Sequence, residues 1–127
     1  MAGTVLVIDD EPDVQTYLST LFEREGLEVE TASDGEEGFT RAQAVKPDLI
    51  FLDILMPRKT GIMLYRRLKK DPALGSIPVV ILTGLTQYRT FFAQEFEQVP
   101  SPEAFVEKPP KPEELLELVR RFVPVAS

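Results

Sequence analysis

Three short apolar runs constrain the fold of this chain more than any other feature of its sequence. They span residues 4–8, 49–52 and 78–82, and none of them contains a charged residue. Short runs that do not alternate with polar residues are typical of strands buried on both faces of a parallel sheet. A sheet of this kind needs helices on both of its sides.

Segments with helical spacing lie between these runs. In the first segment, Pro12 suits the first helical turn and Gly26 is placed as a C-terminal cap. The apolar residues recur at intervals of three and four positions, which predicts one inward face. This predicted face consists of Val14, Tyr17, Leu18, Leu21 and Phe22.

Weaker signals complete an alternation of strands and helices. Residues 28–32 alternate polar and apolar side chains, which favours an edge strand. Asp34 and Glu37 form a plausible N-terminal cap pair for the following helix. The other predicted elements are a helix over residues 60–70, an aromatic-rich helix over residues 85–98, a strand over residues 104–107 and a last helix after Pro112.

Five strands that alternate with five helices predict an α/β fold. We expect a three-layer sandwich with a parallel five-stranded sheet and right-handed crossovers. The length of 127 residues suits one domain over residues 1–127.

The composition excludes several kinds of chemistry. The chain has no Cys and no His, so disulfides, thiolate catalysis, imidazole ligands and a phosphohistidine on this chain are excluded. Its net charge of −7 disfavours nucleic acid as a direct partner. No apolar run reaches the length of a membrane span and no basic leader starts the chain, so we expect a cytoplasmic protein without a membrane partner.

Reactive side chains follow four of the five predicted strands. Asp9 and Asp10 follow the first strand, Asp53 the third, Thr83 the fourth and Lys108 the fifth. Each has an ordinary explanation as a helix cap, a turn residue or a surface cation. Because the carboxyl ends of parallel strands meet at one edge of the sheet, we expect these side chains to converge on one site.

Clustered carboxylates need a cation, since they cannot all stay ionised at close range without one. Oxygen ligands without His or Cys point to Mg²⁺, with Mn²⁺ as an alternative. A metal of this kind, a hydroxyl and Lys108 would suit the oxygens of a transferred phosphoryl group. An aspartate can itself be the nucleophile, and Asp53 is best placed for that role because it follows the central run.

Four motifs occur in order at these strand ends. They are Val7-Ile8-Asp9-Asp10-Glu11, Leu52-Asp53-Ile54-Leu55-Met56-Pro57 with Gly61, Ile81-Leu82-Thr83-Gly84, and Glu107-Lys108-Pro109. Together they resemble the receiver domain of two-component response regulators, of the chemotaxis-regulator type, over nearly the whole chain. The resemblance implies a flavodoxin-like (βα)5 fold with strand order 2-1-3-4-5.

The resemblance also implies a metal site and a phosphorylation site. Asp53 would be the phosphoacceptor, and Asp10 and Asp53 would bind Mg²⁺ directly. Asp9 would bind the metal through water, and the backbone carbonyl of Leu55 would complete the protein ligands.

Three further residues would respond to the phosphoryl group in this family. Thr83 resembles the switch hydroxyl that moves onto it, and Lys108 the lysine that pairs with it. Phe105 stands where the family has an aromatic rotamer switch. The bond between Lys108 and Pro109 is often cis in relatives, which would aim the lysine inward.

The resemblance implies partners on both sides of this reaction. A phosphohistidine on a sensor histidine kinase or a histidine phosphotransfer protein would donate to Asp53. The surface of the fourth helix, fifth strand and fifth helix would then change, and a downstream effector protein or an output domain would read it. A homodimer is also compatible with the sequence. The module would not be a turnover enzyme, although it would assist its own phosphorylation and dephosphorylation.

Two positions near the predicted site carry Leu, which cannot orient a water molecule. Leu55 and Leu85 stand two positions after Asp53 and Thr83, where the family tunes attack of water on the aspartyl phosphate. Leu side chains cannot orient water by hydrogen bonding, so slow autodephosphorylation is predicted.

Two other functions are weighed against this one. One is a constitutive interaction module of the same fold, although such relatives usually lack part of the acidic set. The other is an Asp-nucleophile phosphatase of the haloacid dehalogenase type, which needs a carboxylate where Leu55 stands. Because only five residues follow Phe122, no output domain is expected in this chain.

Overall fold

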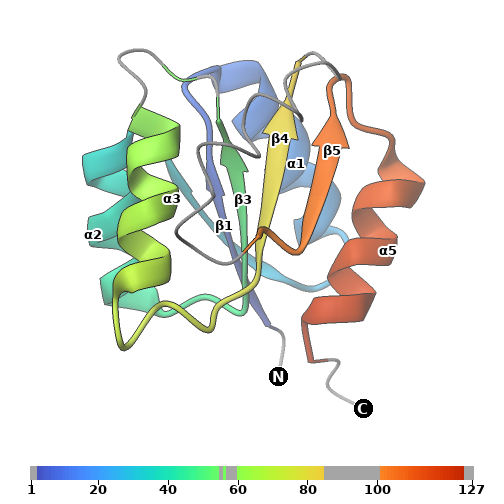
Figure 1. Ribbon diagram of the computed structural model, residues 1–127. Helices are drawn as coiled ribbons and strands as arrows, with labels where there is room; N and C mark the ends of the chain where they lie inside the picture. Colours follow the sequence, from blue (N-terminus) through green and yellow to red (C-terminus); the bar gives the residue numbers. More distant parts are fainter. Residues whose placement is uncertain (1–2, 55, 57–59, 85–100, 125–127) are drawn as a thin grey trace.

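The computed structural model describes residues 3–54, 56, 60–84 and 101–124. It contains a parallel five-stranded sheet in the order β2-β1-β3-β4-β5, as expected (Figure 1). The strands are β1 (Thr4–Ile8), β2 (Glu28–Ala32), β3 (Leu49–Asp53), β4 (Val79–Thr83) and β5 (Ala104–Glu107). The described helices are α1 (Pro12–Glu23), α2 (Gly35–Val45), α3 (Thr60–Lys70) and α5 (Pro112–Phe122). The helix predicted over residues 85–98 lies outside the described residues.

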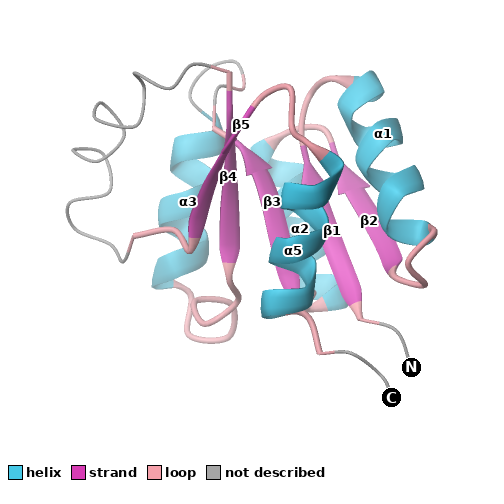
Figure 2. Ribbon diagram, turned by 90° about the vertical axis from the view of Figure 1, so that its right-hand side faces the viewer, coloured by secondary structure: helices cyan, strands magenta, loops and turns pink. Residues whose placement is uncertain are grey.

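Helices cover both faces of the sheet, so the core has two layers. Figures 1 and 2 show α2 and α3 on one face, with α1 and α5 on the other. Successive strand residues point to opposite faces. Leu6 and Ile8 accordingly join the core cluster beneath α2 and α3, whereas Val5 and Val7 join the cluster beneath α1 and α5. The residues of β1 therefore contribute alternately to the two core clusters.

The ends of the first two helices follow the local signals in the sequence. Pro12 is the first residue of α1, and Gly26 has a φ of +82°, which favours glycine just beyond the helix end. At the start of α2, the Glu37 amide donates to Asp34 Oδ1 at 2.8 Å. Glu37 Oε1 in turn accepts from the Ser33 amide at 2.6 Å, so the predicted cap pair is confirmed.

The predicted inward face of α1 is correct at its centre and wrong at Tyr17. Leu18 and Phe22 are fully buried, and Val14 and Leu21 are partly buried against the same cluster. Tyr17 is 39% exposed, and its hydroxyl lies 3.5 Å from the carbonyl oxygen of Pro110. Its ring therefore stands at the border of the helix face, beside the loop that precedes α5.

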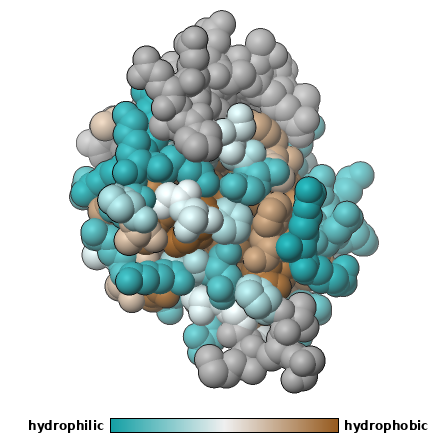
Figure 3. All heavy atoms as spheres, turned by 60° about the horizontal axis from the view of Figure 1, so that its bottom comes forward, coloured by the Kyte–Doolittle hydropathy of each residue, from teal (hydrophilic) through white to brown (hydrophobic). Residues whose placement is uncertain are grey.

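The strand β2 lies at an edge of the sheet, where it pairs with β1. Its alternating pattern fits this position because one side of an edge strand reaches solvent. Figure 3 views the molecule from below, at the end where the strands begin, and hydrophilic side chains cover much of that face. Within the described residues, no helix combines the length and apolar character needed to cross a membrane.

Candidate functional site

Two aspartates are delivered to the carboxyl edge of the sheet by buried strands. Asp9 follows β1 directly, and Asp53 is the last residue of β3. The Asp9 amide donates to the Ala32 carbonyl at 3.0 Å, and the Ile54 amide donates to the Leu82 carbonyl at 3.2 Å. The hydrogen bonds of the sheet thus continue as far as both aspartates. They fix the backbone position from which each carboxylate side chain extends.

The two carboxylates belong to a larger acidic cluster. Asp9, Asp10, Glu11 and Asp53 each offer one oxygen, and these four oxygens all lie within 4.8 Å of one another. Asp9 is fully buried and Asp53 is 4% exposed, whereas Asp10 and Glu11 are exposed. The cluster therefore has a buried floor and an open mouth.

Lys108 closes one side of this cluster. Its backbone amide donates to the Thr83 carbonyl at 2.7 Å, and its peptide bond to Pro109 is cis, as expected. Its ammonium lies 2.9 Å from Asp9 Oδ2, 3.0 Å from Glu11 Oε1 and 3.5 Å from Asp53 Oδ2. Burial by itself lowers the pKa of Lys108, but the carboxylates of Asp9, Glu11 and Asp53 outweigh it and raise this pKa above its ordinary value. The ammonium therefore stays charged.

The cluster keeps an excess of negative charge that a metal ion would balance. The formal charges of the four carboxylates and the one ammonium sum to −3. Asp9 Oδ1 accepts from the Glu11 amide at 2.9 Å. Asp9 Oδ2 is buried and makes no hydrogen bond of good geometry within the described residues, although the Lys108 ammonium is close. An all-oxygen donor set with a buried carboxylate oxygen fits a hard divalent cation such as Mg²⁺.

A glycine at the start of α3 lets this helix approach the site closely. A Cβ at Gly61 would lie 2.5 Å from the Asp53 carbonyl oxygen and 2.9 Å from the Ile54 Cα. Both neighbours are backbone atoms of the strand end, so a larger residue would displace the segment that carries Asp53. Gly61 thus belongs to the support of the site.

The remaining predicted site residues fall into two groups. Thr83 ends β4 and is fully buried, and Phe105 on β5 is partly buried against the core beneath α2 and α3. Phe105 is also in register with Ile81, two residues before Thr83. Leu55 and Leu85 lie outside the described residues, so the metal carbonyl predicted at Leu55 and the tuning positions stay predictions.

Glu11 is a site residue that the sequence analysis did not assign. The sequence places it beside Asp9 and Asp10, but that position predicts a helix start as readily as a contact with the site. Its backbone is extended at the N-cap of α1, and its side chain turns to Lys108 from there. Only the spatial approach of α1 to the loop after β5 reveals the contact.

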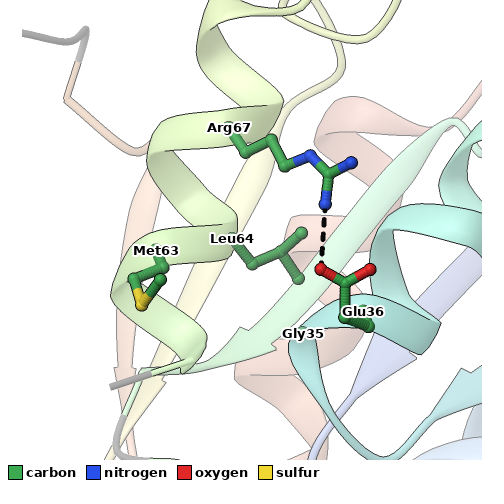
Figure 4. A pocket seen from close by; sticks show the side chains of 5 residues that line it. All are labelled: Gly35, Glu36, Met63, Leu64 and Arg67. Atoms are coloured by element: carbon green, nitrogen blue, oxygen red, sulfur yellow. Dashed lines mark hydrogen bonds and ion pairs between the residues drawn. The ribbon is translucent and has the colours of Figure 1, made fainter. Parts of the chain in front are cut away.

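Hollows on the described surface lie beside the acidic cluster and between α2 and α3. An open pocket of about 580 Å³ lies beside the acidic cluster, where Glu11, Tyr17, Gly84 and Lys108 are among its lining residues. A smaller hollow of about 150 Å³ lies between α2 and α3 (Figure 4). Arg67 Nη1 and Glu36 Oε1 are 3.2 Å apart there, and Met63 lies nearby on α3. The second hollow contains no predicted site residue.

The sequence matches one protein family and several curated proteins over nearly its whole length. The family described as "Response regulator receiver domain" matches residues 5–120. The protein Rrf1 of Nitratidesulfovibrio vulgaris is 34% identical over 121 residues, which cover 95% of this chain and 83% of that protein. The regulator RpaA of Synechocystis, described as a DNA-binding dual master transcriptional regulator, is 35% identical, but the match covers 94% of this chain and 48% of RpaA.

Solved structures agree with the sequence relatives. The chemotaxis protein CheY4 of Vibrio cholerae has a TM-score of 0.84 and 30% identity, and the match covers 96% of this chain and 99% of that one. The signal receiver domain of a histidine kinase from Syntrophus aciditrophicus has a TM-score of 0.82 and 33% identity, covering 95% and 89%. Some relatives are therefore about as long as this chain, whereas others contain the matched region as a part.

Proposed function

The chain belongs to the response regulator receiver domain family, the signalling modules of two-component systems, and on that premise we propose that Asp53 accepts a phosphoryl group from a partner's phosphohistidine. The observation that carries this proposal is the position of Asp53. Its carboxylate ends a buried strand, belongs to a four-carboxylate cluster and lies 3.5 Å from the Lys108 ammonium.

In the proposed reaction, an Asp53 carboxylate oxygen attacks the phosphorus of the phosphohistidine. The new O–P bond forms as the P–N bond breaks, and the electron pair leaves with the imidazole nitrogen of the partner. The chain has no His, so the donor belongs to another protein or domain, a sensor histidine kinase or a histidine phosphotransfer protein. Lys108 is close enough to Asp53 to move onto an oxygen of the transferred group.

A metal ion would bind at the acidic cluster. Asp9, Asp10 and Asp53 would hold Mg²⁺, which when bound neutralises charge that builds up on the phosphoryl oxygens. The backbone carbonyl of Leu55 is a further proposed ligand. Asp9 and Asp53 are both buried, so the site presents them with little freedom to turn away.

The proposed output is a change around β4 and β5. Thr83 would move onto the phosphoryl group, and Phe105 would then turn into the space behind it. Both residues lie on neighbouring strands, with Phe105 in register with Ile81. The proposed surface that a downstream effector or output domain reads includes β5 and α5 together with residues 85–98.

The test is incubation with acetyl phosphate and Mg²⁺, followed by intact-mass measurement. We expect the wild type to gain the mass of one phosphoryl group only when Mg²⁺ is present, and Asp53→Ala to gain none. Asp13→Asn, an exposed carboxylate in the first turn of α1, is the matched control and should react like the wild type. Equal modification of wild type and Asp53→Ala would contradict the assignment of the acceptor.

The lifetime of the modified form is a separate prediction. Slow hydrolysis is proposed because Leu55 and Leu85 offer no hydrogen bond to an attacking water. After removal of acetyl phosphate, loss of the phosphoryl mass is followed over time. A half-life of seconds would contradict this prediction without affecting the assignment of Asp53.

A further inference from the structure

The three carboxylates around Lys108 differ in what they can do when the site is occupied. Asp9 and Asp53 belong to the proposed metal site, and both are buried. Glu11 is the third contact, at 3.0 Å, and its side chain is 59% exposed. An exposed carboxylate regains water when its partner leaves, so its ion pair is broken at low cost.

The backbone fixes Glu11 at the mouth of the site. The Glu11 amide donates to Asp9 Oδ1 at 2.9 Å, and Glu11 is the extended N-cap residue of α1. Pro12 follows at once as the first helical residue, which further restricts the backbone at this point. The Glu11 side chain therefore approaches Lys108 from the open side, opposite the buried floor.

We propose that Glu11 is a positioning residue that holds Lys108 while Asp53 is unmodified and competes for it with the phosphoryl group. This inference rests on the proposed function of Asp53. When Asp53 carries a phosphoryl group, its new oxygens attract the Lys108 ammonium away from Glu11. Glu11 thus favours the unmodified state, and removal of its charge favours the modified one.

Beryllofluoride is the probe, because it mimics a phosphoryl group on an aspartate without forming a lasting covalent bond. Its affinity is measured by NMR titration of ¹⁵N-labelled protein at saturating Mg²⁺. Glu11→Gln should bind about two- to fivefold more tightly than wild type, the range for an ion pair with one exposed partner. Asp13→Asn removes the same charge from the same helix turn and the same pocket, but Asp13 is not among the three carboxylates around Lys108. Its affinity should change by less than that of Glu11→Gln.

A double-mutant cycle tests whether Glu11 acts through Lys108. In a Lys108→Met background, Glu11→Gln should leave beryllofluoride affinity unchanged, because no ammonium remains to be released. A gain of the same size in both backgrounds would overturn the proposal, since it would show a general charge effect. A gain in Asp13→Asn equal to that in Glu11→Gln would overturn it as well.

Titration with Mg²⁺ alone supplies a readout that is independent of the phosphoryl mimic. Glu11→Gln should weaken Mg²⁺ binding more than Asp13→Asn does, because Glu11 belongs to the four-carboxylate cluster and Asp13 does not, although neither is a proposed ligand. If the wild type binds no beryllofluoride, the proposed function of Asp53 fails. If the wild type binds it and Glu11→Gln does not bind it more tightly, the role of Glu11 alone fails.

Discussion

Among the residues that the structure describes, two lysines have mostly buried side chains and lie at opposite ends of the sheet with different partners. Lys69, near the start of β4, has a side chain that is 3% exposed. Its ammonium lies 3.1 Å from the Ile77 carbonyl and 3.4 Å from Glu103 Oε1. Lys108, at the far end, is 17% exposed and contacts three carboxylates.

The difference lies in how well the charges are matched. Glu103 Oε1 also accepts from the Val79 amide at 2.7 Å, so the partner of Lys69 is held by the backbone as well. One ammonium meets one carboxylate there, and the pair joins α3 to the starts of β4 and β5. At the carboxyl edge, one ammonium meets an acidic cluster that exceeds its charge. A balanced ion pair such as that of Lys69 stabilises the fold. The excess negative charge at the acidic cluster can instead bind a cation, or a phosphoryl group together with a cation.

The largest effect should come from breaking the balanced pair. Lys69→Met removes a buried ammonium and its bonds to Glu103 and the Ile77 carbonyl, and we expect a loss of about 2 kcal/mol in the free energy of unfolding. Lys70→Met is the matched control, because Lys70 is exposed on the same helix and should change stability by less than about 0.5 kcal/mol. Urea denaturation measures both. Equal losses in the two variants would mean that the Lys69 pair is not structural.

Mg²⁺ should act on one end of the sheet only. At a concentration ten times its dissociation constant, it should raise the free energy of unfolding by about 1.4 kcal/mol. Lys69→Met should keep this gain in full, and Asp10→Asn should lose most of it. The measurement is urea denaturation with and without Mg²⁺. A gain that disappears in Lys69→Met would show that the two ends are coupled.

Removal of Lys108 should raise the affinity of the acidic cluster for Mg²⁺. Its ammonium competes for oxygens of Asp9 and Asp53, so Lys108→Met should bind Mg²⁺ about fivefold more tightly, or about 1 kcal/mol. Lys111→Met, an exposed cation at the N-cap of α5, is the control and should change the affinity less. Weaker Mg²⁺ binding in Lys108→Met would mean that the lysine supports the metal site.

The smallest effect is expected at alkaline pH, around Tyr65. This residue is fully buried, and burial together with the charge of Glu103 raises its pKa above the ordinary value of 10.0. Above pH 10.0 the folded state keeps a proton on Tyr65 that the unfolded state loses. The contribution of Tyr65 to the free energy of unfolding is therefore intact below pH 10.0 and declines above it. By pH 10.5 the loss should be about 0.8 kcal/mol.

Tyr65→Phe isolates that contribution. Its stability should fall less steeply than that of the wild type between pH 9 and pH 10.5, when both are followed by urea denaturation. The absolute stability of the variant does not matter here, because the slope with pH is compared. Parallel slopes would contradict the raised pKa of Tyr65.

The sequence predicted the sheet well because its strands carry strong signals. The central strands are unbroken apolar runs, and the polar residues that follow them mark where each ends. Parallel strands bring such residues to one edge, so the meeting of Asp9, Asp53 and Lys108 could be predicted without coordinates. Their ion pairs agree with that expectation.

Contacts between separate segments could not be predicted in the same way. The Glu11 contact with Lys108 joins residues 97 positions apart, and no spacing rule pairs them. The Lys69 contact with Glu103 depends on how α3 packs against the starts of two strands. Tyr17 lies at the border of a helix face, where a spacing rule cannot distinguish a buried ring from an exposed one.

The two ends of the described chain meet at the edge opposite the acidic cluster. A Cβ at Gly3 would overlap Val123 Cγ1, and Figure 1 shows the start of β1 and the end of α5 at the lower end of the sheet. A circularly permuted chain could therefore join these ends with a short linker and open instead at the turn around Gly75. Every strand pairing and the full set of strand-end side chains would be retained. Reporter groups fused to the two ends would likewise sit close together and away from the site.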